Sequence, residues 1–262
     1  TVDGYEGTGR GFAIRSREVL DRVTPEWRGL TLETPIRWAP DDPLESLINE
    51  ALLLDARSVE LDEVSGQCRV LCVDRETLVE NESHLRGVFG LLVEGHYRTS
   101  PGDLHRILDA PQLSLLVALE ADAVVGAAVV AREGGFDQRL AQQIAQGKRR
   151  PHGHLLPETI GSQMGLPDAL GQRAMRIVRI AVHPARRRRG YGLALIEAMT
   201  QLAEREQVDY WGAAFGSTVG LLDFWSHAGL RPVRMGTRRG SSSGLYALTC
   251  VAPVSEIGRA HV

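Results

Sequence analysis

The chain has 262 residues, of which 43% are hydrophobic and 24% charged, as is usual for a globular protein that buries a core. Its formal net charge of -3 excludes a uniformly basic nucleic-acid binder, so any RNA-facing surface has to be a local basic patch. The three cysteines are too few, and odd in number, for a disulfide framework, which favours reduced thiols and a cytoplasmic location. No metal site, membrane span or signal peptide is expected.

The first unit is expected to cover residues 1–57. It opens with a glycine-rich loop over residues 1–12, where glycines permit tight turns close to a ligand. A helical stretch is predicted around residues 17–22 and an extended segment over residues 30–38. Asp42 and Pro43 then predict the start of a further helix, because Asp is a good N-cap and Pro suits the first turn. Since the chain opens with Thr1 rather than Met, we expect it to be a fragment.

Residues 58–75 are expected to form a connection that contains a short strand, and residues 76–253 a second domain. Apolar periodicity and turn residues predict helices in this domain over 77–97, 136–147, 190–206 and 219–227. They predict strands over 113–119, 123–131, 176–183, 211–215, 231–235 and 245–251. This alternation indicates an α/β fold with a mixed sheet flanked by helices. Residues 254–262 lack a periodic pattern and are expected to be a non-native or disordered tail.

The strongest motif lies between the predicted strand over 176–183 and the helix over 190–206. Its sequence R-R-R-G-Y-G fits the pattern Q/R-x-x-G-x-G/A. The first N–H groups of a helix have no intrahelical partner, and the helix dipole adds positive potential, so such a turn binds anions. The alternative is a solvated charge run over residues 186–189. We expect this turn to hold a pyrophosphate through Arg187, Arg188, Arg189, Gly190, Tyr191 and Gly192.

This turn, together with a later helix that ends at Gly229-Leu230, resembles the GNAT acetyltransferases. The resemblance implies acetyl-CoA as cofactor and direct acyl transfer from its thioester to a bound amine. It also implies that Ile180, Ala181 and Val182 lend backbone groups to the pantetheine arm.

Further blocks narrow the resemblance, among them G-Y-E-G-T-G-R-G-F (4–12), P-I-R-W (35–38), G-H-Y-R-T-S-P (95–101), R-I-A-V-H-P (179–184) and F-G-S-T (215–218). Together they resemble the bacterial tRNA(Met) cytidine acetyltransferase family. The resemblance implies ATP- or GTP-dependent N4-acetylation of the wobble cytidine of elongator tRNA(Met), with Mg in the full-length protein. It also implies that the C-terminal piece of a RecA/RecD-like helicase domain precedes the GNAT fold.

Arg10 resembles a helicase-type arginine that touches the γ-phosphate of the nucleotide, because a guanidinium is always charged and binds phosphate bidentately. The alternative is that Arg10 is solvated beside a glycine turn. This chain contains no G-x-x-x-x-G-K-[ST] loop, so we do not expect it to hydrolyse ATP by itself.

The N4 amine of cytosine is a poor nucleophile, so its attack needs a base, and histidine suits this role near neutral pH. His96 is the candidate base and Tyr97 an orienter or proton relay; a structural role for His96 remains the alternative. His183 is a competing base, although His183-Pro184 more naturally shapes a turn. Backbone N–H groups of Ala181 or Val182 are expected to stabilise the oxyanion. No acid for the leaving thiolate is identified.

A flipped-out base also needs a basic surface. The loop with Lys148, Arg149 and Arg150, followed by His152 and His154, is the candidate RNA-binding segment; a solvated loop is the alternative. Arg238 and Arg239 form a second candidate patch.

Two other functions stay open. One is a GNAT enzyme that acetylates a protein or small-molecule amine, which would predict an acidic acceptor pocket. The other is an inactive RNA-binding fragment.

Overall fold

The computed structural model describes residues 19–30, 39, 42–53, 56–59, 61, 67–95, 101–240 and 244–261. The candidate site residues Arg10, His96 and Tyr97, and residues 31–38 of the extended segment expected over 30–38, lie outside the described residues. Within them, residues 19–23 are helical and α2 spans Pro43–Ala51. The Asp42 carboxylate accepts a hydrogen bond from the Leu44 amide at 2.8 Å, which confirms the expected cap.

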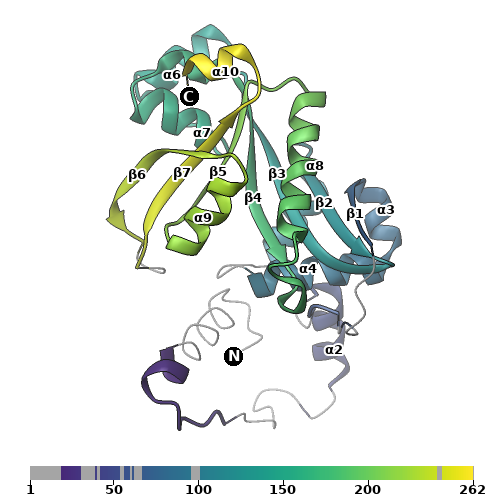
Figure 1. Cartoon of the computed structure of the whole chain (residues 1–262). Helices are drawn as coiled ribbons and strands as arrows, with labels where there is room; N and C mark the ends of the chain where they lie inside the picture. The colour runs from purple at the N-terminus through teal and green to yellow at the C-terminus, as the bar shows by residue number, and fades with distance from the viewer. Residues whose placement is uncertain are drawn as a thin grey trace.

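One mixed sheet organises the rest of the chain, with the strand order β1-β2-β3-β4-β5-β7-β6 (Figure 1). Its strands are β1 (Cys68–Val73), β2 (Leu113–Glu120), β3 (Ala123–Gly134), β4 (Arg173–Val182), β5 (Tyr210–Gly216), β6 (Arg231–Arg239) and β7 (Tyr246–Pro253). All neighbours are antiparallel except β4 and β5, which run parallel. The predicted α/β fold with a mixed sheet is confirmed.

Helices cover both faces of this sheet. They are α3 (Arg75–Glu80), α4 (Glu82–Gly95), α5 (Pro101–Asp109), α6 (Gln138–Ala145), α7 (Leu155–Glu158), α8 (Tyr191–Arg205), α9 (Val219–His227) and α10 (Glu256–His261). Short π- and 3-10 turns lie at Thr159–Gln163, Pro167–Leu170 and Pro184–Arg186. None of the described helices combines the length and hydropathy that a membrane span requires.

The central strands β2 and β3 are apolar on both faces because each face is covered. On one face, α8 packs Leu195 and Met199 against a core that includes Val125 and Ala128 of β3. On the other face, Leu91 and Leu92 of α4 pack with the alternate β3 side chains. The sheet is therefore buried in the middle, and its strand ends are where polar groups are available for a site.

Several elements differ from the sequence-based expectation. The helix predicted over 77–97 is broken at Asn81, whose side chain caps α4 by accepting from the His84 amide at 3.0 Å. Helix α5 was not predicted, because its apolar face is short and forms only through tertiary contacts, such as Leu104 with Phe89. Within the segment 254–262, which was expected to be a non-native or disordered tail, Glu256–His261 form α10. The Ser255 hydroxyl accepts from the Gly258 amide at the start of this helix.

Candidate active site

The two parallel strands separate at the centre of the sheet. β4 and β5 pair only from Ala174↔Tyr210 to Ile177↔Ala213, after which β5 continues beside β7 and leaves β4. A register shift against β3 at Val129/Val130 places an extra residue, Val178, at this point of β4. From Val178 onward, the β4 edge that faces β5 is therefore without a strand partner among the described residues. It can offer backbone groups to a ligand that enters between the strands.

The candidate ligand-binding segment of β4 has side chains on both faces of the sheet. Ile180 and Val182 are half-buried and pack against the α8-side core, whereas the side chain of Ala181 is buried on the α4 side. The three residues expected to contact the pantetheine arm thus lie at the opening, where backbone contacts are the interaction they can provide.

The glycine turn follows at the end of β4. Its residues Arg187–Gly190 are exposed, and both Arg188 (φ 60°) and Gly190 (φ 89°) are in the left-handed region that favours glycine. Gly190 precedes the first residue of α8 and has no side chain to cap it. The first backbone bond of the helix runs from the Ala194 amide to the Gly190 carbonyl at 2.9 Å. The amides of the first helical turn therefore lack intrahelical acceptors and suit an anion such as a diphosphate.

Gly192 serves a different purpose from Gly190. A Cβ at position 192 would lie 3.1 Å from the Phe224 ring of α9, whereas a Cβ at position 190 would meet no atom within 4 Å. Phe224 also packs edge-to-face on Trp225, which stacks on Phe215 of β5. Gly192 thus allows α9 to close over the start of α8, on the β5 side of the opening.

A buried carboxylate holds both ends of this turn, and the sequence analysis did not identify it. Glu120, at the end of β2, accepts from Arg186 Nε at 2.7 Å and Nη2 at 3.1 Å, and from the Tyr191 hydroxyl at 2.7 Å. These hydrogen bonds raise the pKa of Arg186 and of Tyr191. Arg186 is therefore not part of a solvated charge run, and Tyr191 can offer a ligand only its backbone. The sequence did carry a signal for this residue, because Glu120 is the single acidic residue at the end of the apolar run of β2.

His183 has a structural position. Its Nδ1 accepts from the Ala185 amide at 3.2 Å and so caps the short turn Pro184–Arg186. Burial lowers the pKa of His183, while a hydrogen bond with the Val59 carbonyl opposes that shift. The geometry agrees with its expected role in shaping the turn.

Residues on both sides of the segment 96–100 lie against β4: Gly95 before it and Asp103 three positions after it. Gly95 ends α4 so close to the strand that a Cβ there would lie 2.8 Å from Cβ of Ala181. On the other side, Asp103 of α5 forms an ion pair with Arg179 at 3.0 Å. The described residues on either side of this segment therefore both lie beside β4, the proposed acetyl-CoA strand.

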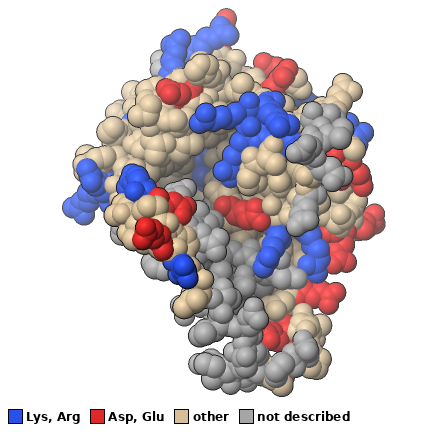
Figure 2. Space-filling view, turned by 60° about the horizontal axis from the view of Figure 1, so that its bottom comes forward, with Lys and Arg blue, Asp and Glu red and all other residues tan. Residues whose placement is uncertain are grey.

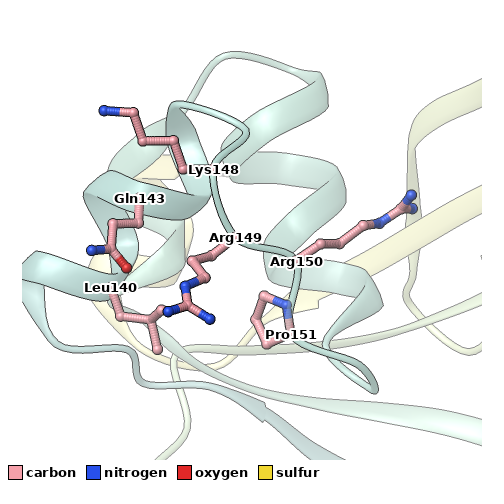
Figure 3. A pocket seen from close by; sticks show the side chains of 6 residues that line it. All are labelled: Leu140, Gln143, Lys148, Arg149, Arg150 and Pro151. Atoms are coloured by element: carbon pink, nitrogen blue, oxygen red, sulfur yellow. The ribbon is translucent and has the colours of Figure 1, made fainter.

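The basic loop after α6 forms a shallow hollow of about 400 Å³, lined by Leu140, Gln143, Lys148, Arg149, Arg150 and Pro151. In Figure 3, the side chain of Arg149 reaches toward Leu140 and Pro151. The side chains of Lys148 and Arg150 extend away from Arg149, in opposite directions (Figure 3). Arg150 is partly neutralised by Glu158, at 2.6 Å. On the face turned forward in Figure 2, Lys and Arg side chains gather in separate groups with acidic side chains between them. On this face the basic surface is therefore divided into local groups (Figure 2).

His154 does not contribute charge to this loop, contrary to expectation. Its Nδ1 accepts from the Gly134 amide at 2.9 Å, and its ring packs on Phe136. Burial lowers the pKa of His154 below its ordinary 6.5. The folded protein therefore binds fewer protons at this site than the unfolded chain, and the stability from His154 is lost as the pH falls from 6.5 through the lowered pKa.

We expect His154→Gln to reduce the loss of stability between pH 7 and about pH 5, because glutamine keeps an acceptor for Gly134 but does not titrate. The measurement is the free energy of unfolding in urea at each pH, with exposed His152→Gln as the control. An unchanged pH dependence in His154→Gln would contradict the assignment.

The fold and the turn define a GNAT acetyltransferase domain. The family model described as "GNAT acetyltransferase 2" matches residues 87–206, and "RNA cytidine acetyltransferase NAT10/TcmA, helicase domain" matches residues 1–55. Among solved structures, the NatC complex bound to Gag peptide and CoA covers 72% of this chain and 99% of that chain, with a TM-score of 0.50 and 13% identity. A polyamine N-acetyltransferase of Drosophila melanogaster covers 72% and 100%, with a TM-score of 0.50 and 15% identity. At these identities the likeness shows the fold.

Curated relatives identify the family more closely. The tRNA(Met) cytidine acetyltransferase TmcA of Nitrosococcus halophilus is 45% identical over 100% of this chain and 36% of its own length. The proteins of the same name from Haloferax volcanii and Vibrio cholerae are 40% and 38% identical, over 99% and 96% of this chain and 35% of their own lengths. The chain thus belongs to the tRNA(Met) cytidine acetyltransferase family, as the resemblance predicted, and it spans about a third of the length of these relatives.

Proposed function

We propose that this chain provides the acetyl-CoA-binding and acetyl-transfer part of a tRNA cytidine acetyltransferase. The acceptor is N4 of the wobble cytidine of elongator tRNA(Met). The observation that carries the proposal is the juxtaposition of the opened β4–β5 pair with the left-handed turn at Gly190 and the uncapped start of α8. The names of the curated relatives support the choice of tRNA as acceptor.

The chain binds acetyl-CoA at two places. Amides of the turn Arg187–Gly192 hold the diphosphate, with positive charge from Arg187, Arg188 and Arg189. Backbone groups of Ile180, Ala181 and Val182 align the pantetheine arm along β4. Bound acetyl-CoA supplies the activated thioester carbonyl.

The residues around the thioester then promote attack by cytidine N4. The Ala181 or Val182 amide donates to the developing oxyanion. His96 removes the proton that N4 loses, and Tyr97 orients His96 or relays the proton. As the new C–N bond forms, the thioester C–S bond breaks and CoA leaves as its thiolate. The positions of Gly95 and Asp103 beside β4 support this assignment, because they bring both flanks of the segment 96–100 to the strand.

The N-terminal part has a separate role. We propose that residues 1–57 are the last segment of a helicase-like ATPase module, joined by residues 58–75 to a GNAT domain at 76–253. Arg10 would contact the γ-phosphate of ATP or GTP, bound with Mg in the whole protein. The helicase-domain match over residues 1–55 supports this.

A cytoplasmic location is supported by three cysteines that are all free thiols.

The RNA approaches over the hollow after α6. Lys148 and Arg149 are exposed there, and neither forms an ion pair with an acidic residue in the described part of the chain. Arg150 joins them when its pair with Glu158 yields to a phosphate.

The test places this chain in the Nitrosococcus halophilus relative in exchange for the segment it matches. The chimera is incubated with labelled acetyl-CoA, ATP and unmodified tRNA, and the label is mapped by nuclease digestion and mass spectrometry. We expect label on the wobble cytidine and about a hundredfold or greater loss of rate in His96→Ala. His105→Ala, an exposed histidine paired with Asp109, is the matched control.

Other outcomes have distinct meanings. Wild-type rates in His96→Ala would remove His96 from the base role while keeping the enzyme. Tight acetyl-CoA binding without label on tRNA would refute tRNA as acceptor and redirect the search to protein and small-molecule amines. Acetyl-CoA binding without transfer to any acceptor would indicate an inactive RNA-binding fragment.

A further inference from the structure

We propose that Glu120 is a positioning residue for the diphosphate-binding turn, which it fixes through Arg186 on one side and Tyr191 on the other. This inference rests on the proposed function, because the turn is taken as the acetyl-CoA site. Glu120 itself does not touch the ligand.

The contacts enclose the turn. Within the described part of the chain, Glu120 accepts two hydrogen bonds from the Arg186 guanidinium and one from the Tyr191 hydroxyl. All three residues are buried, with exposed fractions of 5%, 3% and 6% for Glu120, Arg186 and Tyr191. Arg186 comes directly before the exposed residues 187–190, and Tyr191 directly after them. One carboxylate therefore fixes the entry and the exit of the anion-binding segment.

The turn needs such external support. Arg188 and Gly190 both have positive φ, a conformation that an arginine adopts at a cost. Among the described residues, the turn is bonded to the preceding chain by Arg187 Nε, which donates to the Val182 carbonyl at 3.2 Å, and by a longer backbone bond from Arg187 to Pro184. These two bonds leave the direction of the neighbouring amides unfixed. Fixed ends limit the conformations that this short segment can adopt, so the amides are oriented before the ligand arrives.

Glu120 itself lies in the sheet, between two paired strands. Glu120 is the last residue of β2 and pairs with Cys68 of β1 on one side and Ala123 of β3 on the other. Burial and the Glu120 carboxylate raise the pKa of Cys68. The Glu120 charge is compensated by Arg186, which leaves the exposed Arg187, Arg188 and Arg189 to attract a diphosphate.

The experiment uses the 262-residue chain and a matched control. The hydrogen bonds that Glu120 accepts from Arg186 and Tyr191 are called the Glu120 clamp. Glu120→Gln weakens this clamp, and Tyr191→Phe removes one of its hydrogen bonds with little change in side-chain volume. Glu133→Gln is the control, because Glu133 is equally buried and accepts from Arg176 Nε at 2.5 Å and the Leu156 amide at 2.8 Å, at the opposite end of β3. Two quantities are measured for each: amide hydrogen exchange of residues 187–193 without ligand, and the Kd of acetyl-CoA by calorimetry.

We expect Glu120→Gln to accelerate exchange in residues 187–193 and to raise the Kd by about tenfold, with Tyr191→Phe showing a smaller change of about threefold in the same direction. Glu133→Gln should lower the unfolding temperature but leave both quantities at wild-type values. If Glu120→Gln does not fold, the exchange rates and the Kd of Tyr191→Phe alone test the proposal.

A clamp variant that loses thermal stability like Glu133→Gln, with unchanged exchange and Kd, would show that Glu120 is only structural and overturn the proposal. If Glu120→Gln accelerates amide exchange but the wild-type chain does not bind acetyl-CoA, Glu120 still positions the turn and the proposed function is refuted. The two failures are therefore distinguishable.

Discussion

Gly190→Val is expected to raise the Kd of acetyl-CoA by at least about tenfold. At φ 89° a β-branched residue is strongly disfavoured, at a cost of about 1–3 kcal/mol, so the turn relaxes to a conformation in which its amides no longer converge. Steric exclusion within the free protein is not the cause, because a Cβ at this position meets no atom within 4 Å. Calorimetric titration with acetyl-CoA measures the effect.

The control is Gly147→Val. Gly147 also has positive φ, at 71°, and a Cβ added there would likewise meet no atom within 4 Å, but this glycine follows α6, away from the turn. Both variants should lose similar stability, since the backbone cost is the same. Only Gly190→Val should lose affinity. Equal affinities in the two variants would show that the turn does not bind the diphosphate.

Glu133→Gln is expected to lower the free energy of unfolding by about 1–3 kcal/mol, because one of two buried donors loses its acceptor. The Glu133 side chain is fully buried and that of Arg176 is 17% exposed. The two carboxylate oxygens accept from Arg176 and from the Leu156 amide at the start of α7, whereas glutamine offers one oxygen and turns its NH2 group toward the other donor. Urea unfolding gives the value, and exposed Glu82→Gln, which removes the ion pair with Arg86 on α4, should cost less than about 1 kcal/mol.

The contribution of Glu133 to the free energy of unfolding also depends on pH. Burial raises the pKa of Glu133 more than Arg176 and the Leu156 amide lower it. Between its ordinary 4.5 and the raised value, the folded chain binds more protons than the unfolded chain, so the stability contributed by Glu133 falls as the pH rises through this window. The double variant Glu133→Leu with Arg176→Met should recover most of the stability lost in Glu133→Gln and lose this pH dependence. A double variant less stable than Glu133→Gln would show that the ion pair is net stabilising.

The sequence by itself determined most of the strands and helices and the glycine turn between β4 and α8. The apolar runs of β2 and β3, the Asp42 cap and the bounds of α9 were readable because they depend on local periodicity and on residues close in the chain. The turn Arg187–Gly192 was readable for the same reason, since a strand, glycines and a helix start are consecutive. The family blocks led to the proposed acceptor, which no local pattern encodes.

Tertiary structure decided what these elements do together. Glu120 and Arg186 are 66 residues apart, and only the pairing of β2 with its neighbours brings that carboxylate to the turn. Gly192 is small because Phe224 of another helix packs on it. Burial lowers the pKa of His154, whose Nδ1 accepts from the Gly134 amide at the end of β3. The opening between β4 and β5 exists because β5 leaves β4 to follow β7. These features arise from contacts between distant segments, whose free energy depends on burial and geometry that neighbouring residues do not specify.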